Sequence, residues 1–90
     1  MAVYINNGKG EYFDSYGRPP THEVKKFLER VCVRGYTVAP RLLQSLFSSV
    51  CGNYCLVYLA MKLKGYSTKD FYNLFSNNTT VNDKLVRILT

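Results

Sequence analysis

The chain has 90 residues, which is enough for a single small domain over residues 1–90 and leaves no room for a second one. Apolar residues make up 47% of the sequence, with eight tyrosines and five phenylalanines, and this composition excludes an intrinsically disordered chain. Twelve Lys and Arg against six Asp and Glu give a net charge of +6, which favours acidic or nucleic-acid partners, although the basic residues are scattered and form no arginine-rich block.

Two β-prone runs open the chain. Residues 2–5 and 11–14 flank the segment 6–10, which contains an Asn-Gly pair suited to left-handed backbone angles. This pattern predicts a β-hairpin. The Gly-Arg-Pro-Pro segment at residues 17–20 then breaks the second strand.

A helix is predicted to begin near Thr21, because apolar side chains recur there at i, i+3, i+4 and i+7. They are Val24, Phe27, Leu28 and Val31. Gly35 ends this helix, and residues 36–39 form a third predicted strand that Pro40 stops. We expect an irregular loop over residues 41–50.

A second helix is predicted to begin at Cys51 and to end before Gly65, with two lysines in its last turn. Because this segment is apolar nearly all round, we expect the helix to be buried in the middle of the domain. Two capping boxes, at residues 67–70 and 80–83, precede apolar residues at helical spacing and predict two short C-terminal helices. The order of elements predicts an α+β fold.

Three residues lie where catalytic groups are useful. Cys51 begins the apolar helix, where unpaired amides and the helix dipole favour the thiolate that attacks a carbonyl carbon. Gln44 lies seven residues earlier, where its amide would donate a hydrogen bond to an oxyanion. Asp14 ends the second strand, where a carboxylate would orient an imidazole. Each also has a structural interpretation: a small core residue, a polar loop residue and a turn residue, respectively.

The wider pattern combines Tyr-Phe-Asp-Ser-Tyr-Gly at residues 12–17, Gln44, and Cys-Gly-Asn-Tyr-Cys at residues 51–55, with a C-terminal tail over residues 65–83. In residue types, order and spacing it resembles the adenovirus endopeptidase (adenain) family of cysteine proteases, which occurs in adenovirus-like viruses and related DNA transposons. The resemblance covers essentially the whole chain. It implies a papain-like, adenain-like fold, in which the hairpin and the third strand pack on a buried central helix followed by further helices.

The resemblance also implies a function, cysteine-type endopeptidase activity through a thioester. Cys51 would be the nucleophile, Gln44 the oxyanion-hole donor and Asp14 the carboxylate that orients the base. The implied partner is a protein or peptide substrate. We expect no cofactor and no metal, and DNA stays open as a weak polyanionic partner, because viral members of the family use DNA as a cofactor.

The base is the part of the pattern that this sequence does not show. In the family a His-Trp pair begins the strand that continues into residues 2–5, whereas this chain begins at Met1 and contains no Trp. We therefore expect residues 1–90 to be an adenain-like core without that segment, inactive or impaired as a peptidase, because the general acid for the leaving amine is missing. The one histidine, His22, is expected at the surface in the first turn of its helix.

Three alternatives stay open. A protease of SUMO or ubiquitin-like proteins shares the order His, Asp, Gln, Cys, but usually has an acidic residue before the Cys-Gly pair, where Val50 stands here. A non-catalytic basic module would keep the fold and bind DNA or a partner protein. A zinc site would need Cys32, Cys51, Cys55 and His22, among which no CxxC pair occurs.

The sequence also suggests a compartment. No apolar run approaches the ~20 residues that span a bilayer, and the N-terminus shows no signal-peptide pattern. We expect a soluble, intracellular protein, whether nuclear, cytoplasmic or virion-associated, that is not secreted. Its three cysteines are then expected as reduced thiols, with Cys32 in the core.

Overall fold

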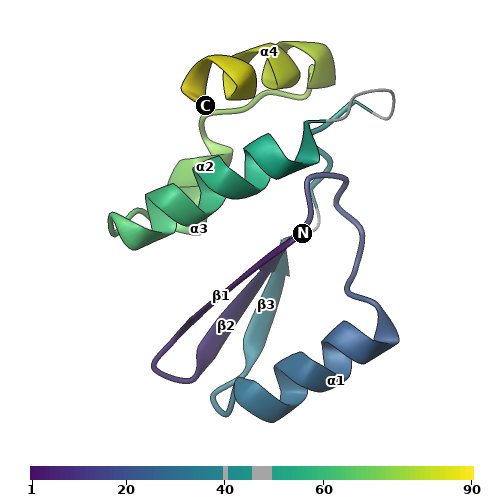
Figure 1. Ribbon diagram of the computed structural model, residues 1–90, viewed down its shortest axis with the longest axis vertical. Helices are drawn as coiled ribbons and strands as arrows, with labels where there is room; N and C mark the ends of the chain where they lie inside the picture. The colour runs from purple at the N-terminus through teal and green to yellow at the C-terminus, as the bar shows by residue number, and fades with distance from the viewer. Residues whose placement is uncertain (40, 46–49) are drawn as a thin grey trace.

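The computed structural model describes residues 1–39, 41–45 and 50–90 (Figure 1). The strands are β1 (Ala2–Asn6), β2 (Lys9–Phe13) and β3 (Tyr36–Ala39), and the helices are α1 (His22–Val31), α2 (Cys51–Leu63), α3 (Thr68–Tyr72) and α4 (Thr79–Leu89). This order confirms the predicted α+β class. The predicted strand stop at Pro40 lies outside the described residues. No helix in the described ranges has the length and apolar character needed to cross a membrane.

The hairpin is tighter than the sequence pattern indicated. β1 and β2 pair antiparallel with Ala2 opposite Phe13, and both strands run up to a turn of only Asn7 and Gly8. These two residues have φ angles of 52° and 79°, so the Asn-Gly pair supplies the left-handed backbone that a two-residue hairpin requires. β3 joins the other side of β2 in parallel, which gives the sheet order β1-β2-β3.

The sheet is covered on both faces (Figure 1). α1 lies on one side, where Leu28 and Cys32 pack with Tyr12 in a small buried cluster, and this confirms Cys32 as a core residue. α2 lies on the other side and contributes to the main core. Alternate side chains of β2 serve the two clusters, since Tyr12 belongs to the first and Phe13 to the second.

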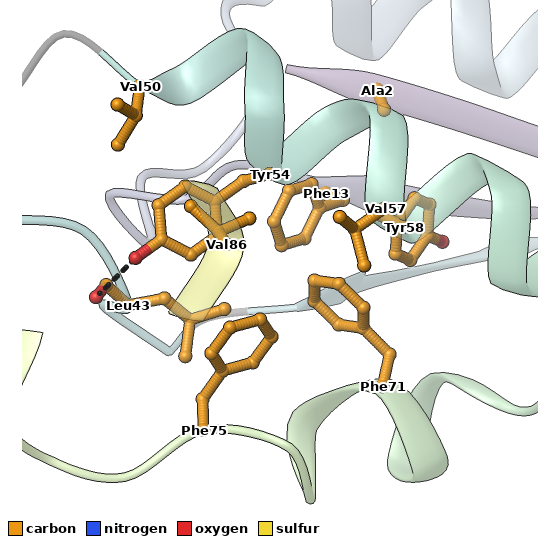
Figure 2. Close-up of a cluster of buried hydrophobic side chains, with 10 residues drawn as sticks. All are labelled: Ala2, Phe13, Leu43, Val50, Tyr54, Val57, Tyr58, Phe71, Phe75 and Val86. Atoms are coloured by element: carbon orange, nitrogen blue, oxygen red, sulfur yellow. Dashed lines mark hydrogen bonds between the residues drawn. The ribbon is translucent and has the colours of Figure 1, made fainter. Parts of the chain in front are cut away.

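The main core is built around aromatic rings (Figure 2). Its buried members are Ala2, Phe13, Leu43, Val50, Tyr54, Val57, Tyr58, Phe71, Phe75 and Val86. The Phe13 ring stacks on Tyr58 with centroids 4.7 Å apart, and it meets Phe71 edge-on at 5.2 Å. This cluster joins β1, β2, α2, α3 and α4 in one core.

The prediction that α2 is a buried central helix is wrong for one of its faces. Tyr54, Val57 and Tyr58 are buried, whereas Leu56 is 64% exposed and Leu63 is 79% exposed. The reason is that β1, α3 and α4 contact only part of the helix surface. α2 is therefore central in position but has an open apolar face in the described part of the chain.

The two predicted capping boxes have different outcomes. Ser67 and Asp70 form the predicted box at the start of α3. The predicted box at residues 80–83 is wrong, because α4 begins at Thr79 and is capped by Asn78, whose side-chain oxygen accepts a hydrogen bond from the Val81 amide at 3.1 Å. Asp83 therefore does not cap α4, and its side chain is buried.

Candidate active site

The three sequence-predicted site residues border the same core. Each directly follows one of the buried core residues that Figure 2 shows: Asp14 follows Phe13, Gln44 follows Leu43, and Cys51 follows Val50. They come from the end of β2, the loop after β3 and the start of α2. A single packed cluster thus sets the positions of three chain segments, of which the first is far from the other two in sequence.

Cys51 is the first residue of α2 and is exposed to solvent. Its N-cap, Val50, makes no side-chain hydrogen bond to the first turn, so the N-cap residue leaves the first amides of the helix unbound by its side chain. The interpretation of Cys51 as a buried core residue is wrong, and that description suits Cys55 better, since it is partly buried one turn later. Cys51 is available to a reagent at a helix end that favours negative charge.

Gln44 is completely buried and is bound by Ser15. The Ser15 hydroxyl donates to Gln44 Oε1 at 2.5 Å, and the Ser15 carbonyl accepts from the amides of Leu43 at 2.8 Å and Gln44 at 3.1 Å. Because the side-chain oxygen of Gln44 accepts from Ser15, its NH₂ group points away from Ser15. The NH₂ group is the part of this side chain that would donate to an oxyanion.

Asp14 is 5% exposed and lies beside this pair. Its carboxylate accepts from Arg18 Nε at 3.0 Å and from the Arg18 and Tyr16 amides at 3.2 and 3.3 Å. Its carbonyl accepts from the Gly17 amide at 2.8 Å, so the structure shows the turn that the alternative interpretation predicted. Asp14 is thus a fixed carboxylate at the edge of the candidate site.

His22 is not part of this arrangement. It is exposed at the start of α1, the helix on the opposite face of the sheet from α2, as the sequence predicted (Figure 1). Within the described ranges no hydrogen bond or ion pair joins it to Asp14.

The residues that hold the Gln44 loop from the other side were not predicted as part of the site. The Tyr54 hydroxyl lies 2.7 Å from Asp83 Oδ1 and 3.2 Å from the Leu43 carbonyl, and Asn82 Nδ2 donates to the same carbonyl at 3.1 Å. Burial, together with the hydrogen bond to Asp83 and its charge, raises the pKa of Tyr54. The signal was present in the helical spacing, because Asn82 shares a face with the buried Val86.

A separate cleft of about 650 Å³ lies at the other end of α2. Its lining includes Lys9, Arg34 and Tyr66, together with Lys62, which forms an ion pair with Glu11 at 2.6 Å. Lys62 is eleven residues after Cys51, so the cleft is roughly 16 Å along the helix from the thiol at 1.5 Å per residue. This cleft is distinct from the candidate active site.

The described residues contain no group of three or more His, Cys, Asp or Glu side chains that would hold a metal ion. Cys32 packs with Tyr12 and Leu28, away from the cluster that borders Cys51. Comparisons with protein-family models, with curated proteins and with solved structures find no match to this chain.

Proposed function

We propose that the chain is the core of an adenain-like cysteine endopeptidase of papain-like fold. The observation that carries the proposal is the exposed Cys51 at the start of α2, directly after Val50 of the same packed cluster that Phe13 and Leu43, the neighbours of Asp14 and Gln44, belong to. Thiol, oxyanion donor and orienting carboxylate are three of the groups that peptide hydrolysis through a thioester uses, and a general acid–base is the fourth.

The chemistry follows from these groups. The Cys51 thiolate adds to the carbonyl carbon of a peptide and forms a C–S bond, while the carbonyl oxygen becomes an oxyanion. The NH₂ group of Gln44 and the backbone amide of Cys51 donate hydrogen bonds to that oxygen. The C–N bond then breaks, the amine leaves with a proton that it takes from solvent water, and a thioester remains. Water hydrolyses the thioester to a carboxylic acid and restores the thiol.

A peptide amine leaves only after it receives a proton, and none of the three residues supplies one. A nitrophenolate leaves without protonation. We therefore expect this 90-residue chain to accept an acyl group from an activated ester, and to cleave peptides poorly. This difference allows the nucleophile and the oxyanion hole to be tested without the base.

The test compares two reactions of the same thiol at one pH. Acylation by p-nitrophenyl acetate passes through an oxyanion, whereas alkylation by iodoacetamide does not, and the ratio of the two rates cancels the thiolate population. We expect Gln44→Ala to lower this ratio by roughly tenfold or more, because one oxyanion donor is lost. Cys51→Ser should abolish the fast phase of both reactions.

Cys55→Ser is the matched control, since Cys55 lies one turn later on α2 and is only partly buried. It should leave both rates at Cys51 unchanged. A ratio unaffected by Gln44→Ala, or an acyl group that mass spectrometry finds on Cys55, would contradict the proposal.

A second candidate function is a basic binding module, favoured by the cleft at the far end of α2. Lys9 and Arg34 line it, and neither forms an ion pair with another described residue. Their two turns are joined by the Arg34 amide, which donates to the Gly8 carbonyl at 2.8 Å. Two exposed cations beside tyrosine rings suit a single nucleic-acid strand, with phosphates on the cations and bases on the rings.

This candidate predicts that Lys9→Ala with Arg34→Ala weakens binding of a short labelled DNA strand by about tenfold, measured by fluorescence anisotropy at low salt. The control removes the same charge from the exposed face of α1, with Lys25→Ala and Lys26→Ala. Equal losses in both variants would show that only the overall charge matters.

A further inference from the structure

The loop that carries Gln44 is held by the C-terminal helix. The carbonyl of Leu43, the residue before Gln44, lies 3.2 Å from the Tyr54 hydroxyl and 3.1 Å from Asn82 Nδ2. The amide of Ser45, the residue after Gln44, donates to Asp83 Oδ2 at 3.4 Å. The main chain is thus bound on both sides of Gln44 by residues of α2 and α4.

These contacts are buried and mutually supported. Tyr54, Asn82 and Asp83 are at most 5% exposed. The Tyr54 hydroxyl links the two halves of the network, since it also lies 2.7 Å from Asp83 Oδ1. Asn82 is fixed in turn by Ser76, whose amide donates to Asn82 Oδ1 at 2.9 Å and whose carbonyl accepts from Asn82 Nδ2 at 2.8 Å.

The Asp83 carboxylate contacts the loop and does not stabilise its own helix. Asp83 lies three residues after Thr80, but its carboxylate accepts from the Tyr54 hydroxyl and the Ser45 amide and does not cap α4. A buried carboxylate needs such donors, because burial without them is unfavourable. Ser15 orients the side chain of Gln44, while Tyr54, Asn82 and Asp83 fix the backbone from which that side chain extends.

We propose that Tyr54, Asn82 and Asp83 are positioning residues of the active site, through which the C-terminal helix sets the place of the Gln44 oxyanion donor. This inference rests on the proposed function. None of the three touches the reacting atoms, and their effect on the reaction passes through Gln44. A displacement of the donor by about 1 Å is enough to weaken transition-state stabilisation severely.

The test again uses the ratio of acylation to alkylation of Cys51 in the full chain. Tyr54→Phe removes one hydroxyl and keeps the ring in the core, and we expect it to lower the ratio by roughly three- to tenfold with alkylation unchanged. Asn82→Ala removes the side-chain amide that donates to the Leu43 carbonyl and should act in the same direction. Circular dichroism confirms that each variant is folded under the assay conditions.

Tyr72→Phe is the matched control. Its hydroxyl is buried and has no hydrogen-bond partner among the described residues, so its removal should leave the ratio unchanged. A double-mutant cycle gives the decisive readout: in the Gln44→Ala background, Tyr54→Phe should have no further effect on the ratio. If Tyr54 had a purely structural role, Tyr54→Phe would lower the free energy of unfolding, and its effect on the ratio would not depend on Gln44.

The outcomes separate the two proposals. If Gln44→Ala lowers the ratio but neither Tyr54→Phe nor Asn82→Ala does, the positioning role is overturned and the proposed function stands. If Tyr54→Phe lowers the ratio equally with and without Gln44, the residue does not act through Gln44, and the inference is also overturned. If Gln44→Ala has no effect, the proposed oxyanion hole is wrong, and the positioning role falls with it.

Discussion

A histidine supplied ahead of the first strand is expected to give this chain peptidase activity. When Gly-His-Trp is added directly before Met1, we expect the rate of peptide cleavage to rise by about 10²- to 10⁴-fold, the range that a positioned general acid–base contributes. The reason lies in the strand register. Ala2 pairs with Phe13, so continuing the ladder puts Met1 opposite Asp14 and carries the added residues past the Asp14–Ser15 corner.

The measurement is cleavage of a fluorogenic peptide by the extended chain. Gly-Gln-Trp is the matched extension, because it has similar size and no titratable group, and it should give no gain. Asp14→Asn in the histidine-extended chain should remove most of the gain, since the carboxylate would no longer stabilise the imidazolium. If the chains with the histidine and glutamine extensions cleave the peptide at the same rate, the proposal that a histidine beside Asp14 acts as the base is wrong.

The largest stability effect is expected at Phe13. Its ring is fully buried, stacks on Tyr58 and meets Phe71 edge-on, so Phe13→Ala should lower the free energy of unfolding by about 3–5 kcal/mol. A domain of this size is stable by only about 5–15 kcal/mol, so the substitution would remove a large fraction of the total stability. Urea denaturation followed by circular dichroism gives the value.

Phe27→Ala is the control, because Phe27 is 43% exposed on α1 and lies outside both buried clusters. It should change the free energy of unfolding by less than about 1 kcal/mol. Comparable losses at Phe13 and Phe27 would contradict the account of an aromatic core between the sheet and α2.

Local patterns in the sequence predicted most of the fold. The Asn-Gly pair marks the hairpin turn, and Thr21 caps α1 through its hydroxyl, which accepts from the Val24 amide at 3.4 Å. The predicted start of α4 was wrong, because Asn78 and Thr80 are both residue types that favour an N-cap position. The choice between them depends on Asp83, whose partner Tyr54 lies 29 residues away, and spacing alone cannot reveal such a contact.

Some features of the candidate site could likewise be predicted from local sequence patterns, and others could not. The place of Cys51 at a helix start follows from local signals, and the structure confirms it. The partners of Gln44 do not follow from local signals, because the Ser15 hydroxyl that orients it is also 29 residues away. The exposed face of α2 was missed for a related reason, since an apolar helix shows what favours burial but not how much neighbouring surface is present to provide it.

The most direct test of the central claim is a crystal structure of the chain with a peptide aldehyde bound to Cys51. The aldehyde forms a hemithioacetal whose oxygen occupies the place of the oxyanion. We expect Gln44 Nε2 and the Cys51 amide to lie about 2.7–3.1 Å from that oxygen, with Gln44 Oε1 still bound by Ser15. A hemithioacetal oxygen that points to solvent, with Gln44 out of hydrogen-bond reach, would contradict the assignment of Cys51 and Gln44 as nucleophile and oxyanion donor.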